Sequence, residues 1–355
     1  MLFRQPFHGR QLTGKKQSGV AIITALLIVT IAVTISISIS TQLQLDIRRT
    51  GNLIALDQSD VYVSLAEKIA QEFLQDQDDF NKLMDTLREE GKFQAPFNVD
   101  NGVILGEITD LNSCINLNTV IDSSVQPPVV DAIVQDRLER LLSNNNIPPT
   151  FVAALIDWID TDSIDFIPGA GAEDGHYLNL EQAYHTANQP LSSITEARLI
   201  KGAEDLQQTP VYAPYSKILE LAEAFRDYAN NWPSLCAFDT SAGIPQINVN
   251  TASKDVLLAL STNMTTADVD AILECRGKDG DEFEEMNDFI NCGGATSGIG
   301  SKITGPDRDQ LVFTSDYFLL KTTVILGDIK KITYSIIFLD SNDSAQIISR
   351  TQRTL

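Results

Sequence analysis

Residues 20–39 read VAIITALLIVTIAVTISISI, twenty consecutive residues without a charged side chain. An α-helix rises about 1.5 Å per residue, so this stretch forms a rod about 30 Å long, the thickness of the hydrocarbon core of a bilayer. We therefore expect one helix that crosses a membrane, and we expect the rest of the chain to be organised around it.

The residues before this stretch are positively charged. Residues 1–19 contain four basic side chains and no acidic one, so the positive-inside rule predicts that they stay in the cytoplasm while the chain after Ser40 crosses the inner membrane. An ordinary signal peptide has a shorter apolar core, of about 7 to 15 residues, followed by small residues where it is cleaved. The only such site behind this longer run is the weak one at residues 36–38.

The sequence KKQSG at residues 15–19 resembles the end of a type IV prepilin leader. The resemblance implies that prepilin peptidase cleaves between Gly19 and Val20 on the cytoplasmic side and that the new amine of Val20 is methylated. The apolar helix then remains as the N-terminus of the mature chain. An uncut signal anchor and an ordinary cleaved signal peptide are the alternatives.

Thr24 occupies the fifth mature position, where pilins and most pseudopilins carry a glutamate. A carboxylate inside a bilayer is costly unless it is paired, and in a growing fibre its partner is the amine of the neighbouring subunit. A subunit without that carboxylate needs no neighbour above it. The chain thus resembles the K family of minor pseudopilins of type II secretion systems, whose members lack the glutamate, are larger than their relatives and cap the pseudopilus.

The 355-residue chain is strongly acidic. Without residues 1–19 it has 22 basic and 48 acidic side chains, a formal charge of −26. Such a chain repels phosphate backbones, so we expect no nucleic-acid binding. The length predicts two globular parts after the membrane helix.

All four cysteines follow the apolar helix, and none forms a CxxC pair. An even number in an exported segment favours disulfides, and the wide spacing argues against a zinc site. Of the three possible pairings we prefer Cys275 with Cys292, which closes a short loop, and hence Cys114 with Cys236. The alternative is that one pair is reduced and buried.

Apolar residues recur at helical intervals from Ile47 to Phe73, which predicts that the first helix continues to about Asp76, before a short helix at 79–90. Alternating β-branched sequence predicts two strands, at 102–110 and 114–118, joined at 111–113. Further helices are expected at residues 129–142, 150–159, 191–202, 215–230, 253–260, 266–276 and 282–289, and an antiparallel three-stranded meander at 317–326, 330–339 and 345–351.

The motif Ile-Asn-x-Asn-Thr occurs twice, at residues 115–119 and 247–251, and a mainly helical stretch follows each copy. We predict an α+β fold in which a pilin-like long N-terminal helix packs on an antiparallel sheet, interrupted by a large all-helical insertion that resembles SAM-like or helix-hairpin-helix units. The expected parts are a leader at 1–19, a membrane and fibre-core helix at 20–45, a first pilin-like part at 46–118, the insertion at 119–240 and a second pilin-like part at 241–355.

Six carboxylates fall within residues 157–174, here called the acidic loop. The segment leaves a predicted helix for a loop that contains Pro168, Gly169 and Gly171. Ca²⁺ takes six to eight oxygen ligands, usually from closely spaced carboxylates and carbonyls on a loop that can bend around the ion. The glycine and the final glutamate of an EF-hand are not at the positions that this motif requires.

The pattern Asp-Trp-x-Asp-x-Asp, followed by Gly-x-Glu-Asp and a nearby Tyr, is similar to a segment of the K family, whose helical domain binds calcium. The resemblance implies a structural calcium ion, with Asp157 either a partner behind the ligands or a helix-end charge. The long insertion at 163–171 leaves open which middle residues coordinate, and a solvated acidic loop is the alternative. The implied ligands are Asp160, Asp162, Asp165, Glu173 and Asp174.

The sequence favours a non-enzymatic protein. After the leader the histidines are His176 and His185, too far apart for two zinc ligands on one helix face, and no GxSxG, HExxH or phosphate-loop motif occurs. We expect a minor pseudopilin at the tip of the type II secretion pseudopilus, anchored in the inner membrane by a single pass with its C-terminal domain in the periplasm. It would assemble with other minor pseudopilins and the major pseudopilin.

Such a tip would initiate or cap the fibre that exports folded proteins across the outer membrane. One alternative is a minor tip pilin of a type IV pilus or DNA-uptake fibre, which shares the leader and the membrane helix. The other is a membrane-anchored periplasmic hydrolase that uses two carboxylates of the acidic loop.

Overall fold

The computed structural model describes residues 18–145, 147–203, 234–276, 282–292, 298–303 and 305–354. Most of the expected leader and the whole helix expected at 215–230 lie outside the described residues. The chain divides into two units, residues 1–58 and 59–355.

The first unit is helical, because α1 (Ser18–Gln75) runs through it before it enters the second unit. The apolar side chains of residues 20–54 are exposed. This helix is long and apolar enough to cross a membrane. The Thr24 hydroxyl lies 3.1 Å from the carbonyl oxygen of Val20 and 3.0 Å from that of Ala21. Its hydrogen bond is therefore made within the helix.

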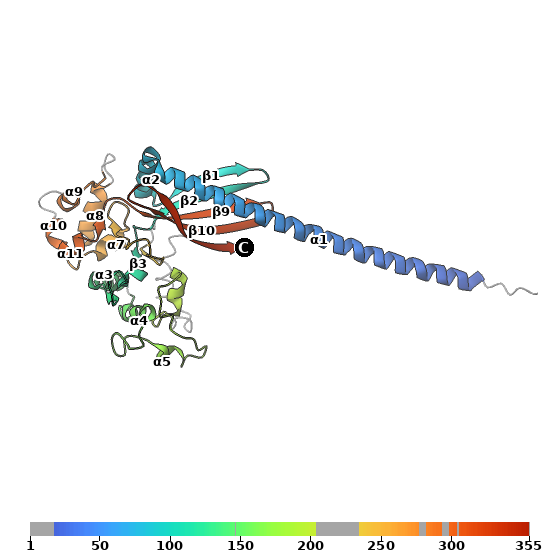
Figure 1. The fold of residues 1–355 in the computed structure, drawn as a ribbon, viewed down its shortest axis with the longest axis horizontal. Coiled ribbons are helices and arrows are strands. Elements are labelled where there is room, and N and C mark those ends of the chain that lie inside the picture. Colours follow the sequence, from blue (N-terminus) through green and yellow to red (C-terminus); the bar gives the residue numbers. More distant parts are fainter. Residues whose placement is uncertain are drawn as a thin grey trace, which may run out of the picture. The chain divides into compact units, whose positions relative to one another are not determined.

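The second unit contains a five-stranded antiparallel sheet with the strand order β1-β2-β9-β10-β11 (Figure 1). The two sequence blocks meet at the β2–β9 pair, whose residues are more than 200 positions apart, so the predicted split sheet is confirmed. The strands are β1 (Phe93–Val99), β2 (Gly102–Asp110), β9 (Tyr317–Leu326), β10 (Ile329–Leu339) and β11 (Ala345–Thr354).

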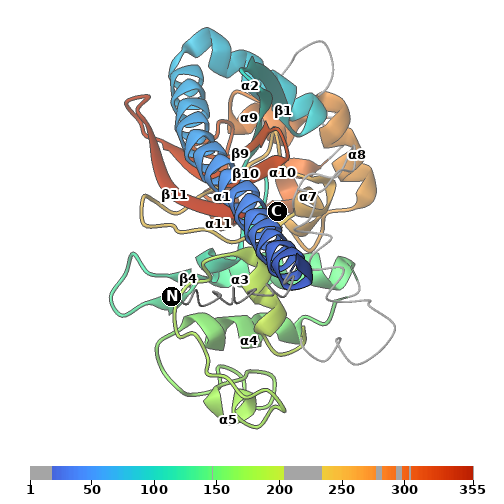
Figure 2. The ribbon, with the colours of Figure 1, turned by 90° about the vertical axis from the view of Figure 1, so that its right-hand side faces the viewer.

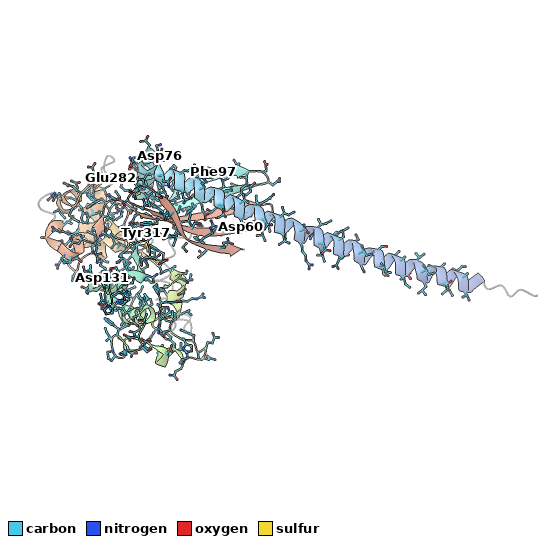
Figure 3. The ribbon with its side chains drawn as sticks, in the orientation of Figure 1. Asp60, Asp76, Phe97, Asp131, Glu282 and Tyr317 are labelled. Carbon is cyan, nitrogen blue, oxygen red and sulfur yellow. A yellow bond between two sulfur atoms is a disulfide. The ribbon has the colours of Figure 1, made fainter. Side chains whose placement is uncertain are left out.

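The last part of α1 and helix α2 (Gln77–Glu90) cover one face of this sheet. Their apolar side chains, such as Leu74 and Leu83, pack against Ile108 and Phe318 in a buried cluster. Asp76, labelled in Figure 3, caps α2 by accepting hydrogen bonds from the backbone N–H groups of its first turn. The pilin-like arrangement of a long helix on an antiparallel sheet is thereby confirmed.

Charged side chains also join residues 59–75 of α1 to the sheet. Glu67 is buried and accepts hydrogen bonds from Ser335, at 2.5 Å, and from Arg350. Asp60, also labelled in Figure 3, pairs with Lys331. Residues 59–75 of α1 are therefore joined to β10 and β11 by polar contacts as well as apolar ones.

The remaining helices surround a second hydrophobic core. Apolar residues of 115–203 and of 247–311 belong to the same buried cluster, so this core crosses the boundary that the sequence predicted at residue 240. Figure 2 shows α3, α4 and α5 on one side of this part and α7, α8 and α9 on another. The helices are α3 (Ala132–Asn144), α4 (Thr150–Ile159), α5 (Asp174–Tyr177), α7 (Lys254–Ala259), α8 (Thr266–Cys275), α9 (Met286–Asn291), α10 (Ile299–Lys302) and α11 (Gly305–Arg308).

Short parallel strand pairs hold the two copies of the Ile-Asn-x-Asn-Thr motif. In the first copy β3 (Ile115–Asn116) pairs with β6 (Leu235–Cys236), and in the second β7 (Ile247–Asn248) pairs with β8 (Leu311–Val312). Nearby, β4 (Ile121–Asp122) pairs with β5 (Val129–Val130).

The expected strand at 114–118, joined to the preceding strand, is wrong. Only two residues are extended, and they pair with β6 rather than with β2. The Asn116 side chain accepts the Asn118 N–H at 3.1 Å and so starts a 3₁₀ helix, η1 (Leu117–Val120).

Several further elements differ from the sequence expectations. The helix expected at 129–142 begins only at Ala132, because residues 129–130 form β5, and the helix expected at 282–289 begins only at Met286. Strand β1 was not expected, because Pro96 in its middle argues against a strand. Proline is tolerated here because β1 lies at the edge of the sheet. The helix expected at 191–202 is a 3₁₀ helix, η2 (Ile194–Leu199).

The second asparagine of each motif is buried and holds two distant segments, and we call Asn118 and Asn250 the asparagine clamps. The Asn118 amide bonds the backbone N–H and carbonyl of Leu191, at 2.8 and 2.9 Å, and the carbonyl of Phe238 at 2.9 Å. The Asn250 amide bonds the same groups of Phe283, at 3.0 and 2.9 Å, and the carbonyl of Phe313 at 3.0 Å.

The cysteines form the pairs that loop length favoured. Cys114 is bonded to Cys236, 122 residues away, and Cys275 to Cys292, 17 residues away. The first disulfide joins the residue before β3 to β6, the strand that pairs with β3, and the second joins α8 to the residue after α9.

Candidate metal site

The acidic loop begins in the last turn of α4, a helix whose residues from Phe151 onward are buried. The buried Asp157 faces the loop rather than solvent. Its two carboxylate oxygens accept the backbone N–H groups of Phe166, at 2.7 Å, and Ala172, at 2.5 Å. One side chain therefore holds two points on the returning part of the loop.

Gly171 is required by this close approach. A Cβ atom at this position would collide with the carboxylate of Asp157. Burial raises the pKa of Asp157, while the two backbone N–H groups act in the opposite direction.

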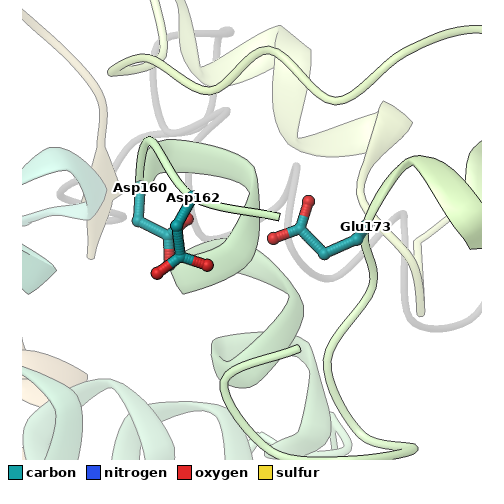
Figure 4. Close-up of side chains that lie close together, drawn as sticks. All are labelled: Asp160, Asp162 and Glu173. Carbon is teal, nitrogen blue, oxygen red and sulfur yellow. The ribbon is translucent and has the colours of Figure 1, made fainter. Parts of the chain in front are cut away.

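Three carboxylates of the acidic loop meet at its base. One oxygen from each of Asp160, Asp162 and Glu173 lies within 4.8 Å of the others. Figure 4 shows Asp160 and Asp162 side by side, just after the end of α4, with the carboxylate of Glu173 pointing toward them from the returning part of the loop. Ligands on opposite sides of a Ca²⁺ ion are about 5 Å apart, so this spacing fits one ion.

The electrostatics of this group also favour a cation. Glu173 is only 6% exposed, and among the described residues neither of its carboxylate oxygens has a hydrogen-bond partner. Its pKa is raised to about 7, first by burial and then by the neighbouring aspartates. The pKa of Asp160 is raised to about 6, by burial and by Asp162 and Asp157. The positive charge of a divalent cation would offset both the burial and the repulsion between these carboxylates.

The donor set consists of carboxylate oxygens, which hard cations prefer. Mg²⁺ demands near-ideal octahedral geometry at short distances, whereas Ca²⁺ accepts the irregular geometry of a flexible loop. The residues therefore fit calcium.

Two of the implied ligands do not join this group of three. Asp174 is turned to the other side, where one oxygen lies 2.8 Å from His185 Nδ1 and the other accepts the N–H and hydroxyl of Thr186, both at 3.0 Å. The hydrogen bond with His185 lowers the pKa of Asp174. Asp165 is half-buried and raises the pKa of Glu173 through its charge.

Two residues that the sequence analysis missed lie beside the loop. Asn188 donates from Nδ2 to the carbonyl of Asp162 at 3.4 Å, and among the described residues its buried Oδ1 has no hydrogen-bond partner. Lys201 donates from Nζ to the carbonyls of Gly169 and Gly171. Asn188 is followed by Gln-Pro, and a proline indicates a break in regular structure near this residue. This is a signal for a loop and not for a metal ligand.

Aromatic side chains support the loop from inside the core. The rings of Trp158 and Tyr177 are 5.3 Å apart, as are those of Tyr177 and Tyr184, whose hydroxyl donates to the carbonyl of Leu199 at 2.7 Å. These rings pack on one another, so they fix the end of α4 relative to the residues after the loop.

The fold and the site define a class of protein: a pilin-like protein with one apolar N-terminal helix, a split antiparallel sheet and a large helical part that carries an acidic loop. Two family models described as "Type II secretion system (T2SS), protein K" match residues 113–215 and 247–314. Over these residues the chain is similar to the type II secretion system protein K family.

Relatives and a solved structure agree with this assignment. The chain is similar to type II secretion system protein K of Aeromonas hydrophila, with 32% identity over 203 residues, 53% of this chain and 60% of that protein. The corresponding Pseudomonas aeruginosa protein is 28% identical over 94% of this chain and 92% of its own length. Both relatives are named as components of a secretion system.

The fold is similar to a chain of the crystal structure of the GspK-GspI-GspJ complex from the type 2 secretion system of enterotoxigenic Escherichia coli. The TM-score is 0.61 at 20% identity, over 86% of this chain and 99% of that one. This similarity shows the shared fold.

Proposed function

We propose that this chain is a minor pseudopilin at the tip of the type II secretion pseudopilus, where it assembles with other minor pseudopilins to initiate or cap the fibre. Similarity to the protein K family supports the type II secretion system as the one in which this chain acts. The similar structure is of a complex with GspI and GspJ, and this supports minor pseudopilins as partners. The basic residues 1–19 support an N-terminus in the cytoplasm and a second unit in the periplasm.

The proposed position at the tip rests mainly on Thr24. Its hydroxyl bonds to the carbonyls of its own helix, so this position requires no partner from another chain. A glutamate here would require a neutralising amine in the membrane. A subunit with Thr24 can therefore end a fibre without leaving an unpaired charge.

Copurification tests this assignment. The full chain is coexpressed with minor pseudopilins I and J of its own secretion system and extracted in detergent, and a complex of all three is expected. A Thr24→Glu variant that assembles along the fibre rather than at its end would agree with the role of Thr24. Recovery of the chain with type IV pilus fibres, and not with I and J, would contradict the proposal.

We further propose that the acidic loop binds one structural calcium ion through Asp160, Asp162 and Glu173, with the amide oxygen of Asn188 as an additional donor. Among the described residues, both carboxylate oxygens of Glu173 and one of Asp160 have no hydrogen-bond partner, and the ion would neutralise these groups. Because the unfolded chain cannot form this site, binding contributes to the stability of the fold.

Thermal unfolding of the full chain in detergent tests the calcium site. At a calcium concentration 100 times the Kd the gain is about 2.7 kcal/mol, or roughly 4 °C in Tm for a unit of this size. The Asp160→Ala/Asp162→Ala variant should lose this shift. The control variant, Asp100→Ala/Asp328→Ala, removes two exposed carboxylates in hairpin turns and should keep it. An equal Tm in calcium and in chelator for the unaltered chain would refute the site.

A further inference from the structure

Lys201 makes three hydrogen bonds to the acidic loop and its surroundings. Its ammonium donates to the carbonyl of Gly169 at 3.0 Å and to that of Gly171 at 2.8 Å. Its backbone N–H donates to the hydroxyl of Tyr177 at 3.1 Å, and Tyr177 is fully buried. The lysine is thus fixed at its backbone by the core and at its charged end by the loop.

Two charged side chains hold the returning part of the loop, residues 166–172. A carboxylate binds its N–H groups, and an ammonium binds its carbonyl groups. The Asp157 carboxylate accepts the N–H groups of Phe166 and Ala172, while the Lys201 ammonium takes carbonyls between them. Glu173 follows directly on this part of the chain. The position of its carboxylate therefore depends on both contacts.

Carbonyl oxygens on an acidic loop are the groups that commonly join carboxylates as calcium ligands. Here a compact ammonium with three donors binds two of them instead. We propose that Lys201 is a positioning residue: its ammonium serves as a built-in cation for the carbonyls of Gly169 and Gly171, so that Glu173 is set for one calcium ion and the loop takes no second one. This inference rests on the calcium site proposed above.

Calcium titration of the full chain in detergent measures both affinity and stoichiometry. The unaltered chain should bind one ion. Lys201→Gln should bind it about 10 to 100 times more weakly, the usual effect of losing a group that orients a ligand. Lys201→Arg, which keeps the charge and several donors, should bind within a few-fold of the unaltered chain. Lys254→Gln removes another lysine, one that pairs with Asp270, and should change nothing.

Thermal unfolding separates positioning from general stabilisation. If Lys201 only stabilised the fold, Lys201→Gln would lower the Tm equally in calcium and in chelator. Positioning predicts that it reduces the increase in Tm that calcium produces.

The outcomes are distinguishable. An unaltered chain that binds no calcium overturns the calcium site and this inference together. A chain that binds calcium, with Lys201→Gln binding equally well, overturns the role of Lys201 alone. Two ions bound to the unaltered chain overturn the claim that Lys201 replaces a second cation.

Discussion

The clamp asparagines of the two Ile-Asn-x-Asn-Thr segments form equivalent hydrogen bonds, but the two segments are followed by different stabilising features. The Asn118 and Asn250 clamps hold equivalent backbone groups. Helix α4 lies between Asn118 and Leu191, and helix α8 lies between Asn250 and Phe283. After α8 the chain is closed by the Cys275–Cys292 disulfide. After α4 the corresponding place carries the acidic loop, with its three clustered carboxylates.

This difference shows two ways to stabilise one kind of segment. A disulfide acts mainly by restricting the unfolded chain, and it persists once it has formed. A metal site acts only on the folded chain and only when the ion is available. Both segments are closed by a disulfide, the first by Cys114–Cys236 and the second by Cys275–Cys292. The proposed calcium ion would in addition make part of the stability of the first segment depend on its surroundings.

The largest expected effect comes from breaking either clamp. Asn118→Ala leaves the buried N–H and carbonyl of Leu191 without the amide that binds them, while the Phe238 carbonyl keeps its hydrogen bond from Asn116. Asn250→Ala has the same effect on the N–H and carbonyl of Phe283 and also removes the hydrogen bond to Phe313. Each unpaired buried group costs about 1 to 3 kcal/mol, so each variant should lose about 4 kcal/mol of unfolding free energy.

Urea unfolding of the full chain measures both losses, with Asn81→Ala, an exposed position on α2, as the control. Similar losses support the equivalence of the two segments. A loss below about 1 kcal/mol at one clamp alone would break the comparison.

The disulfide of the second segment provides the next effect. The Cys275→Ser/Cys292→Ser variant opens a closure of 17 residues, which the chain-entropy model values at about 3 kcal/mol. Because the acidic loop is a separate site, the shift in Tm that calcium produces should be unchanged in this variant. Thermal unfolding with and without chelator checks this. A variant that no longer responds to calcium would show that the two devices depend on each other.

The third effect concerns Asp110, which joins the two sequence blocks. Its buried carboxylate accepts hydrogen bonds from the Asn112 N–H at 2.7 Å, the Ser315 hydroxyl at 2.6 Å and the Thr251 hydroxyl. Burial raises its pKa to about 6 from an ordinary 3.8. The folded state thus holds the proton more tightly than the unfolded state, so stability falls as the pH rises from about 4 through 6.

Asp110→Asn removes this titration. Relative to the unaltered chain, its unfolding free energy should rise by up to about 3 kcal/mol between pH 4 and pH 7. Urea unfolding in chelator across this range measures the difference, with the exposed Asp239→Asn as the control. If Asp110→Asn and the unaltered chain have the same pH slope, the carboxylate is not the source of the effect.

Much of the fold could be predicted because the sequence signals are local. The helix at 150–159 and the strand at 317–326 occur with the expected bounds, since each has the periodicity of its own element. The predictions that were wrong concern residues whose structure depends on partners far away in the sequence. Residues 115–116 are extended because they pair with residues more than 100 positions later, and local alternation could not show that the pairing is parallel and so short.

The candidate site was predictable only in part for the same reason. The spacing of the carboxylates identified the acidic loop, and Asp160, Asp162 and Glu173 do lie together. The spacing could not show that Asp174 turns to His185. Nor could it identify Lys201, because this residue reaches the loop from 30 positions further along the chain.

The β2–β9 pairing has a consequence for the order of folding. Its two strands are separated by more than 200 residues, and the entropy lost in closing such a loop must be paid before any of its hydrogen bonds form. When the intervening helices fold first, the Asn112–Asp316 hydrogen bond brings the strand ends together, at 2.8 Å. The remaining β2–β9 hydrogen bonds can then form in sequence from that point. We therefore expect the helical part to set the rate of folding, with β2 and β9 exposed to aggregation until it is complete.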